Sequence, residues 1–299
     1  MIGILDVIKY NSFKMAPSVE TKDIIGYWGE PTSTLDWCEK NYTYTHYVAE
    51  FWNTITNLSM IITPIYGLIN AYHQGIERRY MICYALLLLT GIGSWMFHMT
   101  LLFEMQLLDE IPMVWGGAFM LYSLYRARNS YDEGGKWVGL ALLSYSIIVT
   151  AVYLFNKNAV FHEFMYGLLV TGIVFLAVKY TYLYYKKGVP LFYAGVVLYG
   201  VGFALWNIDN NFCPRVTDLR ENKLGSNNIL KFLSPLTQLH GWWHLMAGYA
   251  TYIHIMNCIQ HRLNYLGIEH SIEASWIGVS LRVNPNQQRR LRKLTQYQD

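Results

Sequence analysis

Seven long apolar segments constrain the fold of this chain more than any other feature of its sequence. Each is close to the ~20 residues that a helix needs to cross a hydrocarbon core of ~30 Å. Only 14% of the 299 residues are charged, whereas soluble domains carry about 25%. We therefore expect an all-α integral membrane protein, a bundle of seven transmembrane helices at residues 54–72, 81–98, 109–125, 137–155, 162–182, 189–207 and 240–258.

The segments around these spans predict three regions. Residues 1–53 form a mixed polar and aromatic head, 54–258 the membrane domain, and 259–299 a polar, partly basic tail. The head lacks the basic start, short apolar core and cleavage site of a signal peptide, so we expect the mature chain to keep it. The spans follow one another too closely for a second domain, and the one long connection between them is expected at 208–239.

The basic residues predict which end of the bundle faces the cytosol. Seven spans place the two termini on opposite sides, and basic residues gather in the short cytosolic loops. A cytosolic C-terminus places 14 of the 23 basic residues on that side. The head and the loops at 99–108, 156–161 and 208–239 then face the lumen or the exterior. The 14 are Arg78, Arg79, Arg126, Arg128, Lys136, Lys179, Lys186, Lys187, Arg262, Arg282, Arg289, Arg290, Arg292 and Lys293.

Three histidines and one acid are expected at one depth of the bundle, near its lumenal boundary. The second span ends at His98, the third begins at Asp109, and the seventh begins with His240 and His244. Residues four apart share a helix face, so the last two histidines form a natural two-point metal ligand. A third histidine from a neighbouring helix completes the ligand set of a catalytic zinc, whose fourth position is left to water.

Plainer interpretations of these polar residues stay open at this point. A single histidine at an interface is more often a hydrogen-bonded packing residue than a ligand. Ser94 lies one helical turn from His98, and a lone serine more often eases the packing of membrane helices. The residues expected to be structural are His73, His162 and His254, and those expected to be loop or interfacial charges are Glu104 and Glu110.

Two of the four cysteines fall outside the spans. Cys38 lies in the head and Cys213 in the 208–239 connection, both on the expected non-cytosolic side. An oxidising compartment permits a disulfide between them. Sequence does not show whether their Cα atoms come close, so two free thiols remain the alternative.

Motifs in the head and in three of the spans resemble the alkaline ceramidase family. The resemblance runs from about residue 26 to residue 258, and the tail after residue 260 adds nothing to it. The positions at which the family places its zinc and calcium sites match in residue type and spacing. The motifs are Gly26-Tyr27-Trp28-Gly29, Thr32-Ser33-Thr34-Leu35-Asp36-Trp37-Cys38-Glu39-x-Asn41, Ala49-Glu50-Phe51-Trp52-Asn53-Thr54, Gly93-Ser94-Trp95-x-Phe97-His98-Met99-Thr100, Glu104-Met105-Gln106-Leu107-Leu108-Asp109-Glu110 and His240-x3-His244.

The resemblance implies a seven-helix intramembrane hydrolase of the endoplasmic reticulum or Golgi that cleaves ceramide into a sphingoid base and a fatty acid. Its expected partners are ceramide and membrane lipids, with no nucleic acid and no obligate protein partner. The residues it implies are zinc ligands at His98, His240 and His244, catalytic residues at Asp109 and Ser94, a disulfide between Cys38 and Cys213, and a calcium site at Asp36, the Trp37 carbonyl, Glu39, Asn41 and Glu50.

The residue types account for this chemistry. Zinc held by three neutral histidines lowers the pKa of its bound water to about 7 and polarises the amide carbonyl. Asp109 takes the proton of the attacking water and returns it to the leaving amine, while Ser94 donates a hydrogen bond to that water or to the oxyanion. The donors in the head are oxygens, as calcium favours; without the resemblance, they read as a solvated acidic segment.

Two other classes of protein remain as alternatives. A seven-helix lipid receptor or lipid-binding protein would hold a structural zinc closed by a fourth protein ligand, for which Asp109 is the candidate. Replacing Asp109 separates this class from a hydrolase, because losing a ligand releases zinc whereas losing a base stops only turnover. A transporter would carry polar residues along a path through the membrane, yet 137–155 and 189–207 have no charged residue between their ends.

Overall fold

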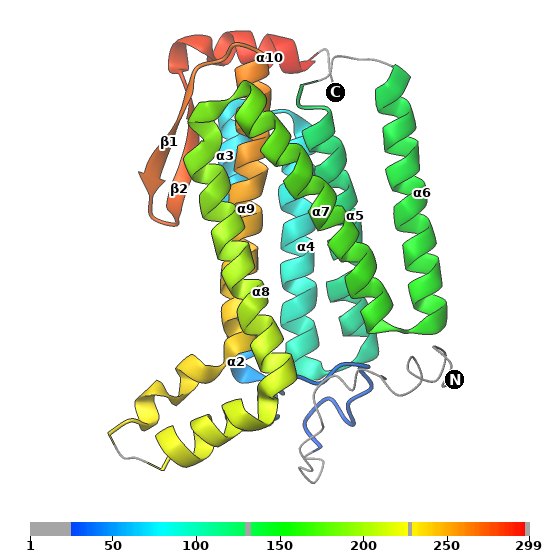
Figure 1. The fold of residues 1–299 in the computed structure, drawn as a ribbon, viewed down its shortest axis with the longest axis vertical. Helices are drawn as coiled ribbons and strands as arrows, with labels where there is room; N and C mark the ends of the chain where they lie inside the picture. The colour runs from blue at the N-terminus through cyan, green and yellow to red at the C-terminus, as the bar shows by residue number, and fades with distance from the viewer. Residues whose placement is uncertain (1–24, 129–132, 227–228, 297–299) are drawn as a thin grey trace, which may run out of the picture.

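The long helices stand side by side as a bundle, with the head at one end and the C-terminal segments at the other (Figure 1). The computed structural model describes residues 25–128, 133–226 and 229–296. The start of the head, residues 1–24, lies outside this described part. The α-helices in the described residues are α2 (Phe51–Thr56), α3 (Leu58–Gln74), α4 (Arg78–Thr100), α5 (Phe103–Tyr125), α6 (Glu133–Asn156), α7 (Ala159–Tyr184), α8 (Val189–Asp218), α9 (Leu239–Tyr265) and α10 (Gln288–Gln296).

Several of these helices have the length and apolarity of membrane spans. Large side chains on their outer faces are exposed, such as Phe155 of α6 and Phe175 of α7, which is the pattern of a surface that meets lipid. Helix α3 has only 17 residues, and α5 and α9 carry acids or histidines that lower their apolarity. Within the described residues, four segments meet both criteria: Arg78–Thr100, Gly135–Asn156, Ala159–Tyr184 and Lys186–Leu224. The expectation of a helical multi-pass membrane protein is therefore confirmed.

The helices extend beyond the ends expected from hydropathy. The first expected span divides at Asn57 into α2 and α3. The expected loop at 99–108 is wrong, because α4 and α5 are joined by a tight turn around Leu101, which adopts a left-handed φ of 55°. The Leu101 carbonyl accepts hydrogen bonds from the backbone of Thr32 and Ser33. The turn thereby attaches the head to the end of the bundle.

The expected connection at 208–239 is also wrong as a loop. Helix α8 continues to Asp218, a π-helical turn follows at Leu219–Leu224, and a 3-10 helix covers Lys231–Thr237. The backbone of Phe212 leaves helical geometry within α8, close to Pro214, which cannot donate to the helix and bends it. The polar residues of this stretch lie on a bent helix that folds back beside the head.

The C-terminal segment is an ordered cap. After α9, strands β1 (His270–Ser275) and β2 (Gly278–Val283) pair antiparallel, and α10 follows. Leu281 and Val283 are buried, and the Leu281 carbonyl accepts a hydrogen bond from the Asn70 side chain of α3. The hairpin therefore packs against the bundle, a contact that the polar composition of the segment did not indicate.

Glycines bring the central helices into close contact. A Cβ atom at Gly91 of α4 would lie 2.5 Å from the Met60 carbonyl oxygen of α3. A Cβ at Gly93 would lie 2.1 Å from the Leu108 carbonyl oxygen of α5, so only glycine permits this approach. Small residues let membrane helices approach backbone to backbone. Helix α4 thus packs closely against both α3 and α5 near the end that carries His98.

Candidate metal centre

Three histidines converge at the end of the bundle beside the head. His98 comes from the last turn of α4, and His240 and His244 from the first two turns of α9. One ring nitrogen from each lies within 4.8 Å of the others, and all three side chains are buried. In the described residues this is the group of histidine, cysteine and acidic side chains whose geometry suits a metal ion.

Hydrogen bonds fix the orientation of two of the rings. Nδ1 of His98 lies 2.5 Å from Oε2 of Glu50, which also accepts a hydrogen bond from the Asn53 side chain. Nδ1 of His244 lies 3.0 Å from the Asn53 carbonyl oxygen and 3.1 Å from the Thr56 hydroxyl. When Nδ1 donates to such partners, Nε2 is left as the electron-pair donor for a metal. The α2 segment therefore sets the tautomer of both histidines.

The third ring is held by stacking. His240 lies on the indole of Trp37, with ring centres 3.9 Å apart, and its Nδ1 atom is buried with no hydrogen-bond partner among the described residues. A buried polar atom without a partner costs about 1–3 kcal/mol. Three neutral imidazoles with an unsatisfied nitrogen among them fit a bound cation, and they are the donor set that zinc accepts.

Ser94 and Asp109 form a pair next to this cluster. Ser94 is buried one turn before His98, and its hydroxyl donates a hydrogen bond to the Asp109 carboxylate. The contact follows from Gly93, whose missing side chain lets α5 approach α4 at Leu108. Asp109 is partly exposed, and it is not part of the group whose ligand atoms all lie within 4.8 Å of one another. The carboxylate is thus held beside the cluster by α4.

The head places oxygen atoms next to the histidines. Both carboxylate oxygens of Glu39 accept backbone hydrogen bonds from the start of α2, from Trp52 at 2.7 Å and from Asn53 at 2.8 Å. Burial and the nearby Glu50 carboxylate raise the pKa of Glu39 to about 8. The Glu39 side chain therefore satisfies two backbone N–H groups in the first turn of α2, whose N-cap residue is Glu50.

Several oxygens in this region are buried and have no hydrogen-bond partner in residues 25–128, 133–226 and 229–296. They are Oε1 of Glu50 and the side-chain oxygens of Asn41 and Asn53. Burial and the charge of Asp36 raise the pKa of Glu50 well above its usual range. Clustered oxygens with excess negative charge are what hard divalent cations bind, so the donor set fits calcium.

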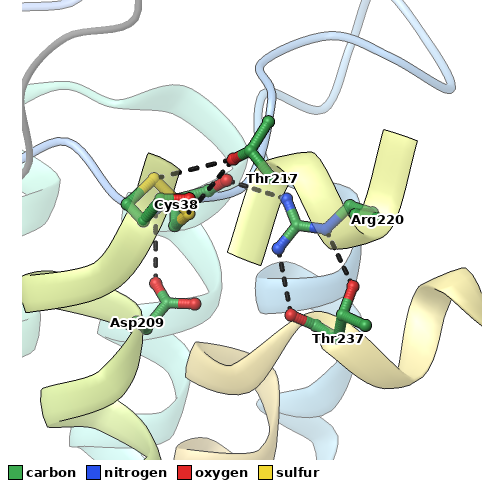
Figure 2. Close-up of a disulfide and its surroundings, with 6 residues drawn as sticks. Cys38, Asp209, Thr217, Arg220 and Thr237 are labelled. Carbon is green, nitrogen blue, oxygen red and sulfur yellow. Dashed lines mark hydrogen bonds between the residues drawn. A yellow bond between two sulfur atoms is a disulfide. The ribbon is translucent and has the colours of Figure 1, made fainter. Parts of the chain in front are cut away.

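A disulfide between Cys38 and Cys213 joins the head to α8, with Cα atoms 5.4 Å apart. Figure 2 shows the surrounding polar contacts. The Arg220 guanidinium donates to the Cys38 carbonyl at 2.9 Å and to the Thr237 hydroxyl at 3.0 Å. Asp209 accepts from the Cys38 backbone at 3.3 Å. These bonds connect the head, α8 and the segment before α9 around the histidine cluster.

Glu110 is buried, so its assignment as a loop or interfacial charge is wrong. Its carboxylate accepts hydrogen bonds from the Tyr153 hydroxyl and from Gln106 at 3.1 Å, and its carbonyl lies 2.8 Å from Nε2 of His162. Gln106 also bonds to Thr34 of the head. The four-residue spacing of Gln106 and Glu110 on one helix face was the available signal, but their partners come from α6, α7 and the head. In contrast, Glu104 is exposed.

Two other histidines of the long helices, His254 and His73, differ in their surroundings. Nδ1 of His254 lies 2.9 Å from the carbonyl oxygen of Ala250 on its own helix. His73 is exposed near the end of α3. Both lie away from the cluster formed by His98, His240 and His244.

Comparisons with known proteins place most of the chain in one group. A family model described as Ceramidase matches residues 29–284. Alkaline ceramidase 3 of Mus musculus is 41% identical over 252 residues, which cover 84% of this chain and 91% of that protein. Alkaline ceramidase YPC1 of Saccharomyces cerevisiae is 32% identical over 272 residues, covering 84% and 83%. Because the family match continues to residue 284, the expectation that the segment after residue 260 adds nothing is wrong.

Proposed function

Because the chain belongs to the alkaline ceramidase family, we propose that it hydrolyses the N-acyl amide of ceramide to a sphingoid base and a free fatty acid. The observation that carries this proposal is the buried cluster of His98, His240 and His244 inside a bundle of apolar helices. Ceramide has two hydrocarbon chains and resides in the bilayer. A hydrolytic centre within a membrane bundle therefore meets its substrate without extracting it into water.

The metal in this proposal is zinc, held by the three histidines. Glu50 and the Asn53 carbonyl hold Nδ1 of His98 and His244, so each ring offers its other nitrogen. When bound, zinc supplies a water of lowered pKa and polarises the amide carbonyl. Stacking on Trp37 keeps the third ring, His240, facing the other two.

Asp109 is the proposed general base and acid. Its carboxylate accepts the proton of the attacking water and returns it to the leaving amine nitrogen, which requires no covalent intermediate. Ser94 interacts with the Asp109 carboxylate, and a hydroxyl that donates to this acid has no second hydrogen for an oxyanion. We therefore assign Ser94 to positioning Asp109, a narrower role than the one expected from the sequence.

Calcium is the proposed second metal, bound in the head. The donors are Asp36, the Trp37 carbonyl, Glu39, Asn41 and Glu50. Support comes from the unpartnered oxygens of Asn41 and Glu50 and from the burial of Glu39 and Glu50. Because Glu50 also contacts His98, calcium bound here would order the residue that orients a zinc ligand.

The proposed topology is a seven-span bundle with the histidine end toward the lumen of the endoplasmic reticulum or Golgi and the C-terminus in the cytosol. Three observations support it. Helices α3, α5 and α9 run through the same bundle as the four apolar segments (Figure 1). The basic residues favour a cytosolic C-terminal end, and a disulfide at the histidine end suits an oxidising compartment.

The test is ceramide hydrolysis together with metal content, measured on the purified full-length protein in detergent. Asp109→Ala should keep about one zinc and lose about 10²–10⁴-fold in turnover, as expected for removal of a general base. Glu104→Ala removes an exposed acid from the same helix and should leave both readouts unchanged. A panel of ceramides differing in acyl chain and sphingoid base then defines specificity.

Two outcomes would contradict the hydrolase. If the parent protein binds zinc but releases nothing from any ceramide at neutral to alkaline pH with calcium, a lipid receptor or lipid-binding protein becomes the better explanation. If Asp109→Ala releases the zinc, Asp109 is a ligand of a closed structural site. Extraction of bound lipid from the parent would then identify the ligand.

A further inference from the structure

A cavity of about 340 Å³ opens at the end of the bundle opposite the histidines. It lies between the C-terminal ends of α5 and α7, which Figure 1 shows together at the end that carries the β-hairpin and α10. Tyr125 is roughly 24 Å along α5 from Asp109, at 1.5 Å per residue. The described residues that line the cavity include two cations and no carboxylate; they are Tyr125, Arg128, Leu176, Lys179, Tyr180 and Tyr184.

Two aromatic rings hold the guanidinium of Arg128 in place. Arg128 follows α5, and its guanidinium carbon lies 3.9 Å from the ring centre of Tyr184 and 5.5 Å from that of Tyr265. Nη1 is buried and has no hydrogen-bond partner among the residues that the structure describes. Stacking fixes the plane of a guanidinium but leaves its in-plane N–H groups unsatisfied, and such buried donors favour an acceptor.

Arg262, a second arginine at this end of the bundle, differs from Arg128 because it is paired with a carboxylate. Arg262 of α9 donates to the Glu77 carboxylate at 2.7 Å and is buried with it. Arg128 stands instead beside the cavity, with Lys179 of α7 as the second cation of its lining. The Arg128 guanidinium can donate two parallel N–H bonds to a phosphate, and the Lys179 ammonium adds a positive charge beside it.

We propose that this cavity binds a phosphate group. Basic pockets between transmembrane helices at the cytosolic side bind the headgroups of anionic lipids, and this cavity lies between two such helices at their ends. A soluble phosphate offers the same chemistry. The site is separate from the proposed ceramide hydrolysis, so its test is a binding measurement that does not depend on turnover.

The experiment uses delipidated, full-length protein in detergent. Native mass spectrometry follows the addition of phosphatidylglycerol, with phosphatidylcholine as the net-neutral comparison, and thermal unfolding follows the addition of inorganic phosphate. The parent should bind phosphatidylglycerol more tightly than phosphatidylcholine. Arg128→Gln and Lys179→Gln should each weaken phosphatidylglycerol binding about tenfold, the loss of one charge-assisted contact, and Arg128→Lys should fall between parent and glutamine.

The control variant is Arg289→Gln, which removes an exposed positive charge from α10 at the same end of the bundle. It should bind phosphatidylglycerol as the parent does. Stabilisation by inorganic phosphate that is lost in Arg128→Gln supports the site and identifies soluble phosphate as a source. Equal affinities of parent and Arg128→Gln, or an equal loss in Arg289→Gln, would overturn the proposal. If Arg128→Gln does not fold, the exposed Lys179→Gln carries the same test.

Discussion

The two ends of the bundle differ in which of their buried polar atoms lack a hydrogen-bond partner. At the histidine end, buried oxygens of Asn41, Glu50 and Asn53 have no hydrogen-bond partner within the described part of the chain. At the opposite end, Glu77 is neutralised by Arg262 and Arg79, and Nη1 of Arg128 has no partner. Unpartnered acceptors favour cations, whereas an unpartnered cationic donor favours an anion. The proposed metal sites rest on the first set of atoms, and the proposed phosphate site rests on Arg128 and its cavity.

The contacts that hold the two ends of the bundle also differ. The histidine end is tied to the head by a disulfide, by Arg220 and by the backbone of Leu101. The opposite end is closed by the hairpin and α10, which pack through apolar residues such as Leu291. Metal ligands need fixed positions to within a few tenths of an ångström, and covalent and charged ties supply that rigidity.

The largest effect is expected from removing one histidine of the cluster. His244→Ala leaves two ligands, too few for a catalytic zinc site, so zinc per chain should fall from about one to near zero and ceramide hydrolysis should be lost. His254→Ala is the matched control on the same helix, at a histidine bonded to Ala250. Elemental analysis that finds equal zinc loss in both variants would contradict the assignment of the centre to one end.

A smaller effect is expected at the acid behind His98. Glu50→Gln keeps an acceptor oxygen but removes the charge opposite Nδ1, so zinc affinity should weaken about 10–100-fold, as for other carboxylates bonded to ligating histidines. Competition with a zinc chelator measures the change. Glu104→Gln, at an exposed site, should behave as the parent. Unchanged zinc affinity in Glu50→Gln would show that the contact has no role in metal binding.

The contact between α4 and α5 can be tested at its closest point. A side chain at Gly93 would collide with the Leu108 carbonyl, so Gly93→Ala should cost about 1–3 kcal/mol of stability through overpacking. It should also lower kcat about tenfold with zinc retained, because a small displacement of a catalytic group is costly. Gly167→Ala, where a Cβ meets nothing within 4 Å, is the control. Equal turnover in both variants would argue against the positioning of Asp109 by this contact.

The smallest effect on turnover is expected from the disulfide. Replacing Cys38 and Cys213 together by serine should lower the free energy of unfolding by about 2–5 kcal/mol, the usual contribution of a native disulfide. The Tm in detergent should fall accordingly, and a reductant should lower the Tm of the parent but not that of the variant. A parent Tm that is insensitive to complete reduction would show that other contacts hold the head.

Much of the helical framework was predictable because a membrane imposes it. A span needs about 20 apolar residues, so hydropathy located helices such as α4, α6 and α7. The same rule failed where polar residues face the protein interior. Gln106 and Glu110 read as loop and boundary residues because hydropathy sums composition and does not record which face a side chain occupies. The polar stretch before His240 was assigned to a loop for the same reason, although α8 continues to Asp218.

The sequence by itself determined the helical membrane class and the three histidines that meet, because helix direction and the four-residue spacing of His240 and His244 place them at one depth. Only the tertiary structure decided what holds them. Glu50 lies 48 positions before His98 in the chain, yet their side-chain atoms are 2.5 Å apart. The contact between Ser94 and Asp109 depends on a backbone approach at Gly93. Periodicity fixes where residues lie along one helix, whereas contacts between helices depend on side-chain volume and packing, which no local pattern contains.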